Sequence, residues 1–173
     1  MGLAEARGGN KPRAGRGPGA TRGHRPDVAR IVEVGAKEVT EREAVAACAI
    51  SMTPRACREL MSGTPKGNPL EAARVAGIMA VKRTPDLLPF CHPVAVTGAE
   101  VSVEPRVDEG RILVQATVRA HDRTGVEMEA LTASAVAALC LYDTAKAYDR
   151  AAVISELRLL SKLGGKSGEY RAP

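Results

Sequence analysis

Two stretches of alternating apolar and polar residues, separated by a short turn, constrain the fold of this chain most strongly. Residues 98–107 read GAEVSVEPRV, residues 111–120 read RILVQATVRA, and the turn between them is Asp-Glu-Gly. Strands that alternate in this way bury one face, and a short glycine-containing connection between them is typical of an antiparallel hairpin. Other elements must therefore cover the apolar face of this hairpin.

Helical and strand patterns surround the hairpin. They predict strands over residues 30–35, 44–52 and 152–160, a short helix that begins at Pro54 and ends at Ser62-Gly63, and longer helices over residues 69–84 and 126–149. In the helix over 69–84, apolar positions 75, 78 and 79 mark the predicted buried face, and Lys82 continues it toward the core. The order of elements predicts an α+β sandwich of ferredoxin-like type, with helices packed on one face of an antiparallel sheet.

The charge of the chain is concentrated at its N-terminus. Residues 1–30 hold seven basic and two acidic residues, which accounts for the net charge of +5, whereas residues 31–173 hold eighteen of each sign. The first 27 residues are rich in Gly, Arg and Pro and too poor in apolar residues to offset the entropy of ordering them. The composition predicts a disordered basic tail over 1–27 and a single domain over 28–173.

The four cysteines are scattered along the chain, at positions 48, 57, 91 and 140. No Cys-x-x-Cys pair and no Cys/His cluster has zinc-site spacing, so free thiols in a reducing compartment are expected and a protein-held metal is not. No apolar run is long enough to cross a bilayer, and the N-terminus lacks the apolar core of a secretory signal. These features predict a cytoplasmic protein.

An aspartate and a lysine share one face of the predicted helix over 126–149. Asp143 and Lys146 are three positions apart, and the residues from Ala135 to Leu141 before them are almost wholly apolar. The simpler interpretation is an ordinary helical ion pair. We favour the other interpretation, a buried pair whose pKa values move toward neutrality and allow proton transfer.

Lysines are few in this chain, with seven against eighteen arginines. This chain therefore supplies most of its positive charge as arginine. Lysine at positions 66, 82 and 166 suggests a role that arginine does not fill, such as a compact phosphate ligand or a titrating group. Lys66 precedes the helix over 69–84, where bound phosphate is favoured. Lys166 lies in the glycine-rich segment GGKSG, which could close over an anionic ligand.

The start of the helix over 126–149 holds two acids. Thr124 and Glu127 have the spacing of a capping box, which explains Glu127 structurally. Met128 and Glu129 follow and are free to face a ligand, with Glu129 able to accept from the N–H groups of a base edge. His121-Asp122, in the preceding turn, is predicted to be a solvated loop pair.

The segment LLPFCHPV places Cys91 directly before His92. On the residues alone, this dipeptide is a nucleophile with its base, half of a metal site, or part of a binding loop. No second Cys/His pair completes a metal site.

Several long, ordered motifs together resemble the molybdenum cofactor biosynthesis protein C family, the cyclic pyranopterin monophosphate synthases. They are VEVGAKEVTEREAVA, KGNPLEAARVAGIMAVKRT, LLPFCHPV, TGVEMEALTASAVAALCLYDTAKA and RLLSKLGGKSG, and the resemblance covers about residues 28–170. It implies a ferredoxin-like fold and a homohexamer of three dimers with active sites between subunits. It also implies that the substrate is the cyclised dihydro-GTP made by an upstream radical SAM enzyme, and that the products are cyclic pyranopterin monophosphate and pyrophosphate, with no cofactor.

The same resemblance assigns expected roles to individual residues. The catalytic aspartate and its lysine fall on Asp143 and Lys146. The remaining expected roles, in substrate binding, fall on Phe90, Cys91, His92, Met128 and Glu129, with Lys66, Lys82 and Lys166 on the triphosphate. Cys91 is then not a nucleophile, because the reaction opens and rebuilds rings and attacks a phosphate, and the segment LLPFCHPV is a binding loop.

An RNA-binding module is the alternative, because ferredoxin-like sheets can host RNA and the N-terminal tail is basic. Such sheets stack bases on aromatic side chains, and this chain has one Phe, three Tyr and no Trp. The neutral charge of residues 31–173 also argues against nucleic acid as the partner.

Overall fold

The computed structural model describes residues 28–65, 67–166 and 168–173. The elements are β1 (Thr40–Ser51), α1 (Pro54–Met61), α2 (Pro69–Leu87), β2 (Val96–Arg106), the 3₁₀ helix η1 (Val107–Glu109), β3 (Arg111–Asp122), α3 (Glu127–Ala145), β4 (Val153–Leu163) and β5 (Tyr170–Arg171). Among these residues, no helix is long and apolar enough to span a membrane.

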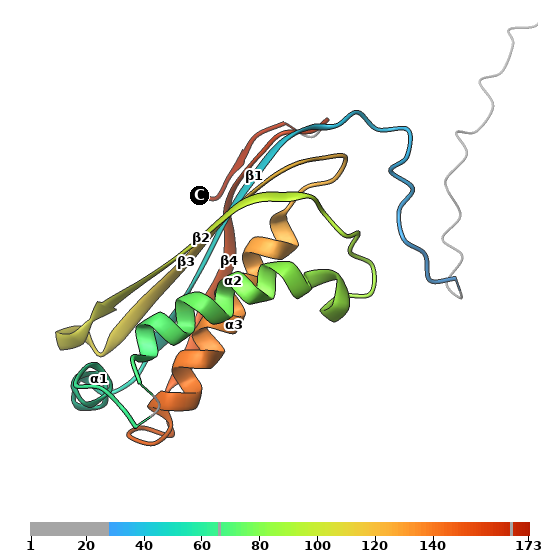
Figure 1. Ribbon diagram of the computed structural model, residues 1–173. Coiled ribbons are helices and arrows are strands. Elements are labelled where there is room, and N and C mark those ends of the chain that lie inside the picture. The colour runs from blue at the N-terminus through green and yellow to red at the C-terminus, as the bar shows by residue number, and fades with distance from the viewer. Residues whose placement is uncertain (1–27, 66, 167) are drawn as a thin grey trace, which may run out of the picture.

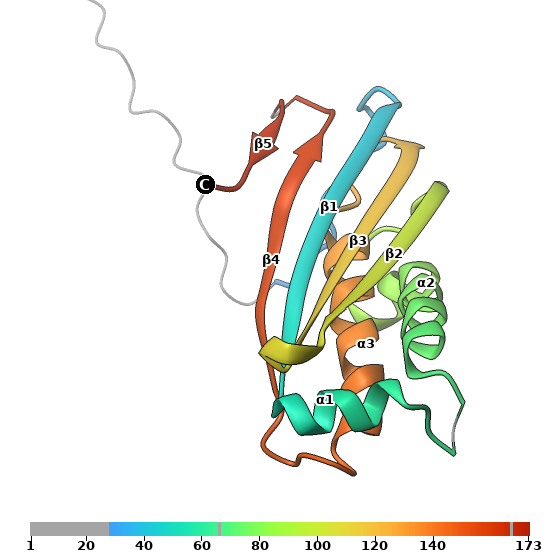
Figure 2. The same ribbon diagram turned by 90° about the vertical axis from the view of Figure 1, so that its left-hand side faces the viewer.

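The five strands form one sheet in the order β2-β3-β1-β4-β5, and all neighbouring strands are antiparallel. Helices α2 and α3 lie on one face of this sheet, and α1 lies at one end (Figures 1 and 2). Without α1 and the short β5, the order of elements is βαββαβ, which is that of the ferredoxin-like fold. The predicted α+β architecture and the predicted hairpin are therefore confirmed.

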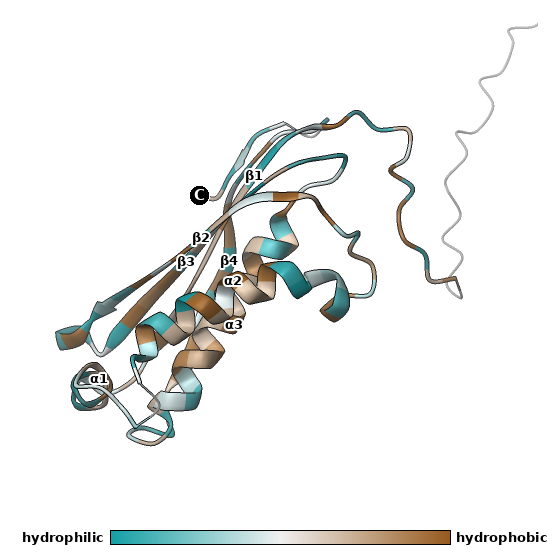
Figure 3. Cartoon of the chain, viewed as in Figure 1, coloured by the Kyte–Doolittle hydropathy of each residue, from teal (hydrophilic) through white to brown (hydrophobic). Residues whose placement is uncertain are grey.

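The core lies between the sheet and the two long helices. Alternate residues of β3 are buried, from Ile112 to Ala120, and they face the buried alanines of α3. Hydrophobic residues run along α2, α3 and the strands that they cover (Figure 3). A Cβ on Gly77 of α2 would lie 3.0 Å from a methyl of Val101 and 3.1 Å from the carbonyl oxygen of Ala133 on α3. The two helices and β2 therefore meet with no space for a side chain at this point.

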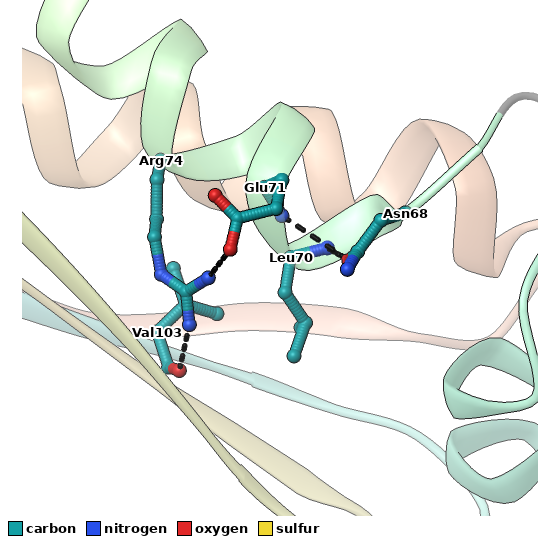
Figure 4. Close-up of polar contacts among 5 residues, drawn as sticks. All are labelled: Asn68, Leu70, Glu71, Arg74 and Val103. Carbon is teal, nitrogen blue, oxygen red and sulfur yellow. Dashed lines mark hydrogen bonds and ion pairs between the residues drawn. The ribbon is translucent and has the colours of Figure 1, made fainter.

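The N-terminus of α2 is fixed by side chains (Figure 4). Asn68 caps the helix by accepting hydrogen bonds from the backbone N–H groups of Leu70 and Glu71, at 3.0 and 3.3 Å. Arg74 pairs with Glu71 and donates to the carbonyl oxygen of Val103 on β2, at 3.4 Å. These contacts tie the start of α2 to the sheet.

The predicted helix boundaries and faces need three corrections. Helix α2 continues through Pro85 to Leu87, because a proline in the last turn costs only one intrahelical hydrogen bond. Its buried face consists of small residues such as Ala73 and Ala80, whereas Val75 and Met79 are 56% and 58% exposed. Lys82 is consequently exposed rather than directed toward the core.

Three further predictions, for the first strand and for the helix over 126–149, are also wrong. Residues 30–35 form no strand but part of an extended segment that leaves the sheet (Figure 1). Helix α3 ends at Ala145, and it begins after Val126 without a side-chain cap, so the predicted capping box of Thr124 and Glu127 does not form. Glu127 instead pairs with Lys162 of β4 at 3.1 Å.

Candidate active site

Most of the described residues predicted to form the active site lie at opposite ends of the α2–α3 pair. At one end, the C-terminus of α2 meets the N-terminus of α3 and the loop before β2. The cavity there, which we call the Glu129 cavity, has a volume of about 330 Å³. It is lined by Ile78, Val81, Lys82, Pro85, Pro93, Val94, Val96, Ala99 and Glu129. Lys82 and Glu129, predicted separately from two segments, therefore meet in one cavity.

Glu129 has a buried carboxyl group with a raised pKa. The residue is 3% exposed, and burial raises the pKa of its carboxyl above the usual range, with a smaller contribution from the charge of Glu127. Its own backbone N–H opposes this shift. Such a carboxyl group stays protonated up to a higher pH than that of an exposed glutamate. In its protonated form it can donate a hydrogen bond to a ligand.

The loop over residues 90–92 lies beside this cavity. Phe90 is exposed at 57%, whereas Cys91 and His92 are half-buried. Burial, followed by the nearby charge of Glu129, raises the pKa of the Cys91 thiol. Because a thiol that stays protonated is a poor nucleophile, this shift favours a binding role for the loop. Met128, also predicted to bind substrate, is 41% exposed on the first turn of α3.

Asp122 is a structural feature of this end that the sequence analysis missed. Its carboxylate accepts hydrogen bonds from the backbone N–H groups of Ala95 and Arg123, at 2.8 and 2.6 Å. The bond from Ala95 is the main reason why the pKa of Asp122 lies below its usual value. Asp122 is thus not a solvated loop residue; it ties the segment that follows His92 to the end of β3. Aspartates near turns often accept backbone N–H groups in this way, which is the signal that could have identified it.

At the other end of the helix pair, Asp143 and Lys146 form the predicted ion pair. The distance from the Asp143 carboxylate to Lys146 Nζ is 2.7 Å, and the two side chains are 53% and 54% exposed. The predicted burial is wrong, because α3 packs on the sheet through a different set of positions, including Ala138, Leu141 and Ala145. The hydrogen bond to Asp143 is the main cause that raises the pKa of Lys146, so the amine stays protonated at neutral pH.

The pair lies in a cavity of about 600 Å³, the Asp143 cavity. It is lined by Thr64, Pro65, Tyr142, Asp143, Thr144, Lys146, Ala147, Tyr148 and Arg150. Thr64 and Gly67 close a turn on each other through two hydrogen bonds, of 2.9 and 3.0 Å. Lys66, predicted to bind phosphate, lies outside the described residues.

The Asp143 cavity and the Glu129 cavity are separate in this chain. Asp143 and Glu129 are fourteen residues apart on α3, and at 1.5 Å per residue the helix separates them by about 21 Å. The structure of one chain therefore does not bring the two predicted groups of site residues together.

Lys166 lines a third cavity, of about 740 Å³, at the other side of the start of α3. Its charged lining residues are Lys37, Glu38, Arg42, Arg123, Glu127, Lys162 and Lys166. Gly164 and Gly165 have φ values of 98° and 77°, and a Cβ on Gly165 would collide with the guanidinium of Arg42. Arg42 thus lies directly against the glycine turn that precedes Lys166, a contact that the sequence analysis did not predict.

Comparisons with known proteins identify the family of this chain. A model of the MoaC family matches residues 31–165. Three relatives, each named cyclic pyranopterin monophosphate synthase, are similar over most of their lengths. The protein of Pelotomaculum thermopropionicum is 52% identical over 82% of this chain and 84% of its own. The protein of Streptomyces griseus is 53% identical over 83% of this chain and 80% of its own. The protein of Rhodospirillum rubrum is 50% identical over 82% of this chain and 86% of its own. This chain therefore belongs to the MoaC family.

Proposed function

We propose that this protein is a cyclic pyranopterin monophosphate synthase of molybdenum cofactor biosynthesis. It converts (8S)-3',8-cyclo-7,8-dihydroguanosine 5'-triphosphate to cyclic pyranopterin monophosphate and pyrophosphate. The observation that carries this proposal is the identity of about half of the aligned residues to enzymes that bear this name, over four fifths of the chain. The alternative of an RNA-binding module has no support in these relatives.

Asp143 and Lys146 are the proposed catalytic pair. The reaction opens a ring, rebuilds it as a pterin and closes a cyclic phosphate, and each stage moves protons. The hydrogen bond to Asp143 keeps the amine of Lys146 protonated. When substrate takes the place of this bond, the ammonium can give its proton to a leaving or ring atom, and the Asp143 carboxylate can take one back. Because the pair is exposed in one chain, bound substrate and neighbouring protein must exclude water from it during the reaction.

The Glu129 cavity is the proposed binding site for the rest of the substrate. Glu129, as a buried carboxyl group at the start of α3, suits recognition of the N–H groups of the purine-derived ring. Lys82 provides a positive charge in the same cavity for the phosphates. The loop residues Phe90, Cys91 and His92, together with Met128, complete this part of the proposed site, and Lys66 and Lys166 are proposed to hold the triphosphate.

We further propose that the enzyme is a homohexamer, a trimer of dimers, in which each active site combines two chains. The separation of about 21 Å between Asp143 and Glu129 along α3 supports a site of this kind. Val75 and Met79 of α2 and Leu139 of α3 are all more than half exposed, and association of chains would cover such residues. Each chain contributes one catalytic domain over residues 28–173, and the enzyme works in the cytoplasm on the product of a radical SAM enzyme.

Incubation of the purified protein with the cyclised GTP intermediate tests the proposed activity. We expect one pyrophosphate for each pterin product, measured by a coupled pyrophosphate assay and by fluorescence of the oxidised pterin. GTP itself should release none, because it lacks the second bond between ribose and base, from C3' to C8, that the rearrangement requires. A folded protein that leaves the intermediate unchanged contradicts the proposal.

Replacing Lys82 by Ala should weaken substrate binding by roughly 10- to 100-fold, which corresponds to the loss of one hydrogen bond to a charged group. The measurement is titration calorimetry in an Asp143→Asn background, so that the substrate is not consumed. Arg83→Ala is the matched control, because Arg83 is the adjacent cation on α2, 72% exposed and only 3.6 Å from Asp86. Equal dissociation constants for the Lys82 and Arg83 variants would remove Lys82 from the site.

A further inference from the structure

We propose that Asp149 is a positioning residue for Lys146, acting through the turn that joins α3 to β4. This inference rests on the proposed function, in which Lys146 is the proton donor. Neither the sequence motifs nor the predicted site residues include Asp149.

The position of Lys146 depends on the chain that follows α3. The helix ends at Ala145, and Lys146 is its C-cap. Beyond it, the chain folds back on the last helical turn, where the N–H groups of Tyr148 and Asp149 both donate to the carbonyl oxygen of Ala145, at 2.8 Å. Lys146 is therefore the first residue of a turn, and its side chain is about half exposed. Its backbone N–H donates to the carbonyl oxygen of Tyr142, at 2.9 Å, so the end of the helix and the turn that follows together hold the backbone that carries the amine.

The side chain of Asp149 fixes the turn to the rest of the fold. One carboxylate oxygen accepts a hydrogen bond from the backbone N–H of Thr53, at 2.9 Å, and the other accepts from Ala151, also at 2.9 Å. Thr53 is the N-cap of α1 and lies 96 residues earlier in the chain. A single carboxylate thus joins the start of α1 to the second half of the turn.

The charge state of Asp149 and its neighbours agree with this role. The hydrogen bond from Thr53, followed by that from Ala151, lowers the pKa of Asp149, so the carboxylate is ionised throughout the neutral range. The residues on either side of it in sequence, Tyr148 and Arg150, line the Asp143 cavity together with Lys146. Loosening the turn therefore displaces the wall of the cavity as well as the proton donor.

The test compares two substitutions that remove the contacts in steps. Asp149→Ala removes both acceptors and should reduce kcat by on the order of 10²-fold, with a much smaller change in KM, because the donor is misplaced while the binding groups at the Glu129 cavity are unaffected. Asp149→Asn keeps one acceptor oxygen and should recover part of kcat. Equal kcat values for wild type and Asp149→Ala overturn the proposal.

Two control variants separate positioning from general loss of stability. Leu60→Val weakens the core beneath α1, where Leu60 is fully buried, without touching the carboxylate. It should lower Tm while kcat, measured well below Tm, stays at the wild-type value. Asp108→Ala removes a fully exposed acid and should change neither. The proposal would also be overturned if Leu60→Val and Asp149→Ala had the same Tm and kcat fell equally far in both variants.

A second measurement does not depend on turnover. After reductive ¹³C-methylation of the lysines, the NMR resonance of Lys146, assigned from its absence in Lys146→Arg, reports the pKa of its amine. Asp143 and Tyr142 are the groups whose charges raise this pKa, and Arg150 and Tyr148 line the same cavity. Asp149→Ala should lower it, and Asp143→Asn should lower it at least as far. If the wild type shows no turnover but the pKa of Lys146 changes in Asp149→Ala, only the proposed function is contradicted. If the pKa of Lys146 is the same in both proteins, the role of Asp149 is contradicted.

Discussion

Replacing Asp143 by Asn or Lys146 by Ala is expected to reduce turnover by roughly 10²- to 10⁴-fold, the usual contribution of a positioned acid or base. Substrate should still bind, because the proposed binding groups lie at the Glu129 cavity. The measurements are single-turnover pyrophosphate release and titration calorimetry on each variant. Both substitutions are at exposed positions, so neither should unfold the protein.

The double variant and a matched ion pair make this test specific. If Asp143 and Lys146 act as one unit, the double variant should be little slower than either single variant. Arg83 and Asp86 provide the control, since they form another exposed pair with the same spacing, on α2. Their substitution should leave turnover unchanged. Additive losses at Asp143 and Lys146, or substantial activity in Asp143→Asn, would falsify the assignment.

Mixing two inactive variants is expected to restore activity if each site combines two chains. One chain carries Asp143→Asn, and the other carries Lys82→Ala together with Glu129→Gln. After joint unfolding and reassembly, about one quarter of the sites should unite an intact Glu129 cavity from the first chain with an intact Asp143 cavity from the second, by random pairing across a shared interface. Turnover should therefore rise from near zero to about one quarter of the wild-type value.

The control for this experiment uses two lesions in the same cavity. A mixture of Asp143→Asn and Lys146→Ala chains should remain inactive, because each site takes both residues from one chain. Native mass spectrometry must show that mixed oligomers have formed in both mixtures. Mixed oligomers that recover no activity in the first mixture would place the whole site within a single chain.

The sequence predicts the sheet of this protein better than the faces of its helices. The alternation in β2 and β3 is strict, so both the strands and their pairing follow from it. In α2, however, the buried face is built from Ala73, Gly77 and Ala80, and the larger Val75 and Met79 point away from the sheet. Side-chain size thus indicated the wrong face, because close approach of two helices selects small residues.

The candidate site shows the same limit. The pairing of Asp143 with Lys146 follows from their spacing, but their exposure depends on which side of α3 faces the sheet, and an apolar helix of nearly uniform composition does not indicate that side. The place of Asp122 near a turn signals that it accepts backbone N–H groups, but it does not indicate which distant group. The pairings of Asp122 with Ala95 and of Asp149 with Thr53 could not be predicted, because these partners are backbone groups far away in the chain. Hydrogen bonds of this kind leave no pattern in a single sequence.

The absence of space at Gly77 limits which substitutions this protein can accept as its sequence changes during evolution. A Cβ at position 77 would lie 3.0 Å from Val101 and 3.1 Å from the carbonyl oxygen of Ala133, which is closer than ordinary van der Waals contact, so even a methyl group there requires α2 or its neighbours to shift. Lys82 and Thr64 lie toward opposite ends of α2, and a displacement in its middle moves both. Surface loops can change in length and composition without this effect. Substitutions that enlarge residues between the two helices should therefore be rejected in related chains, even at positions far from any substrate.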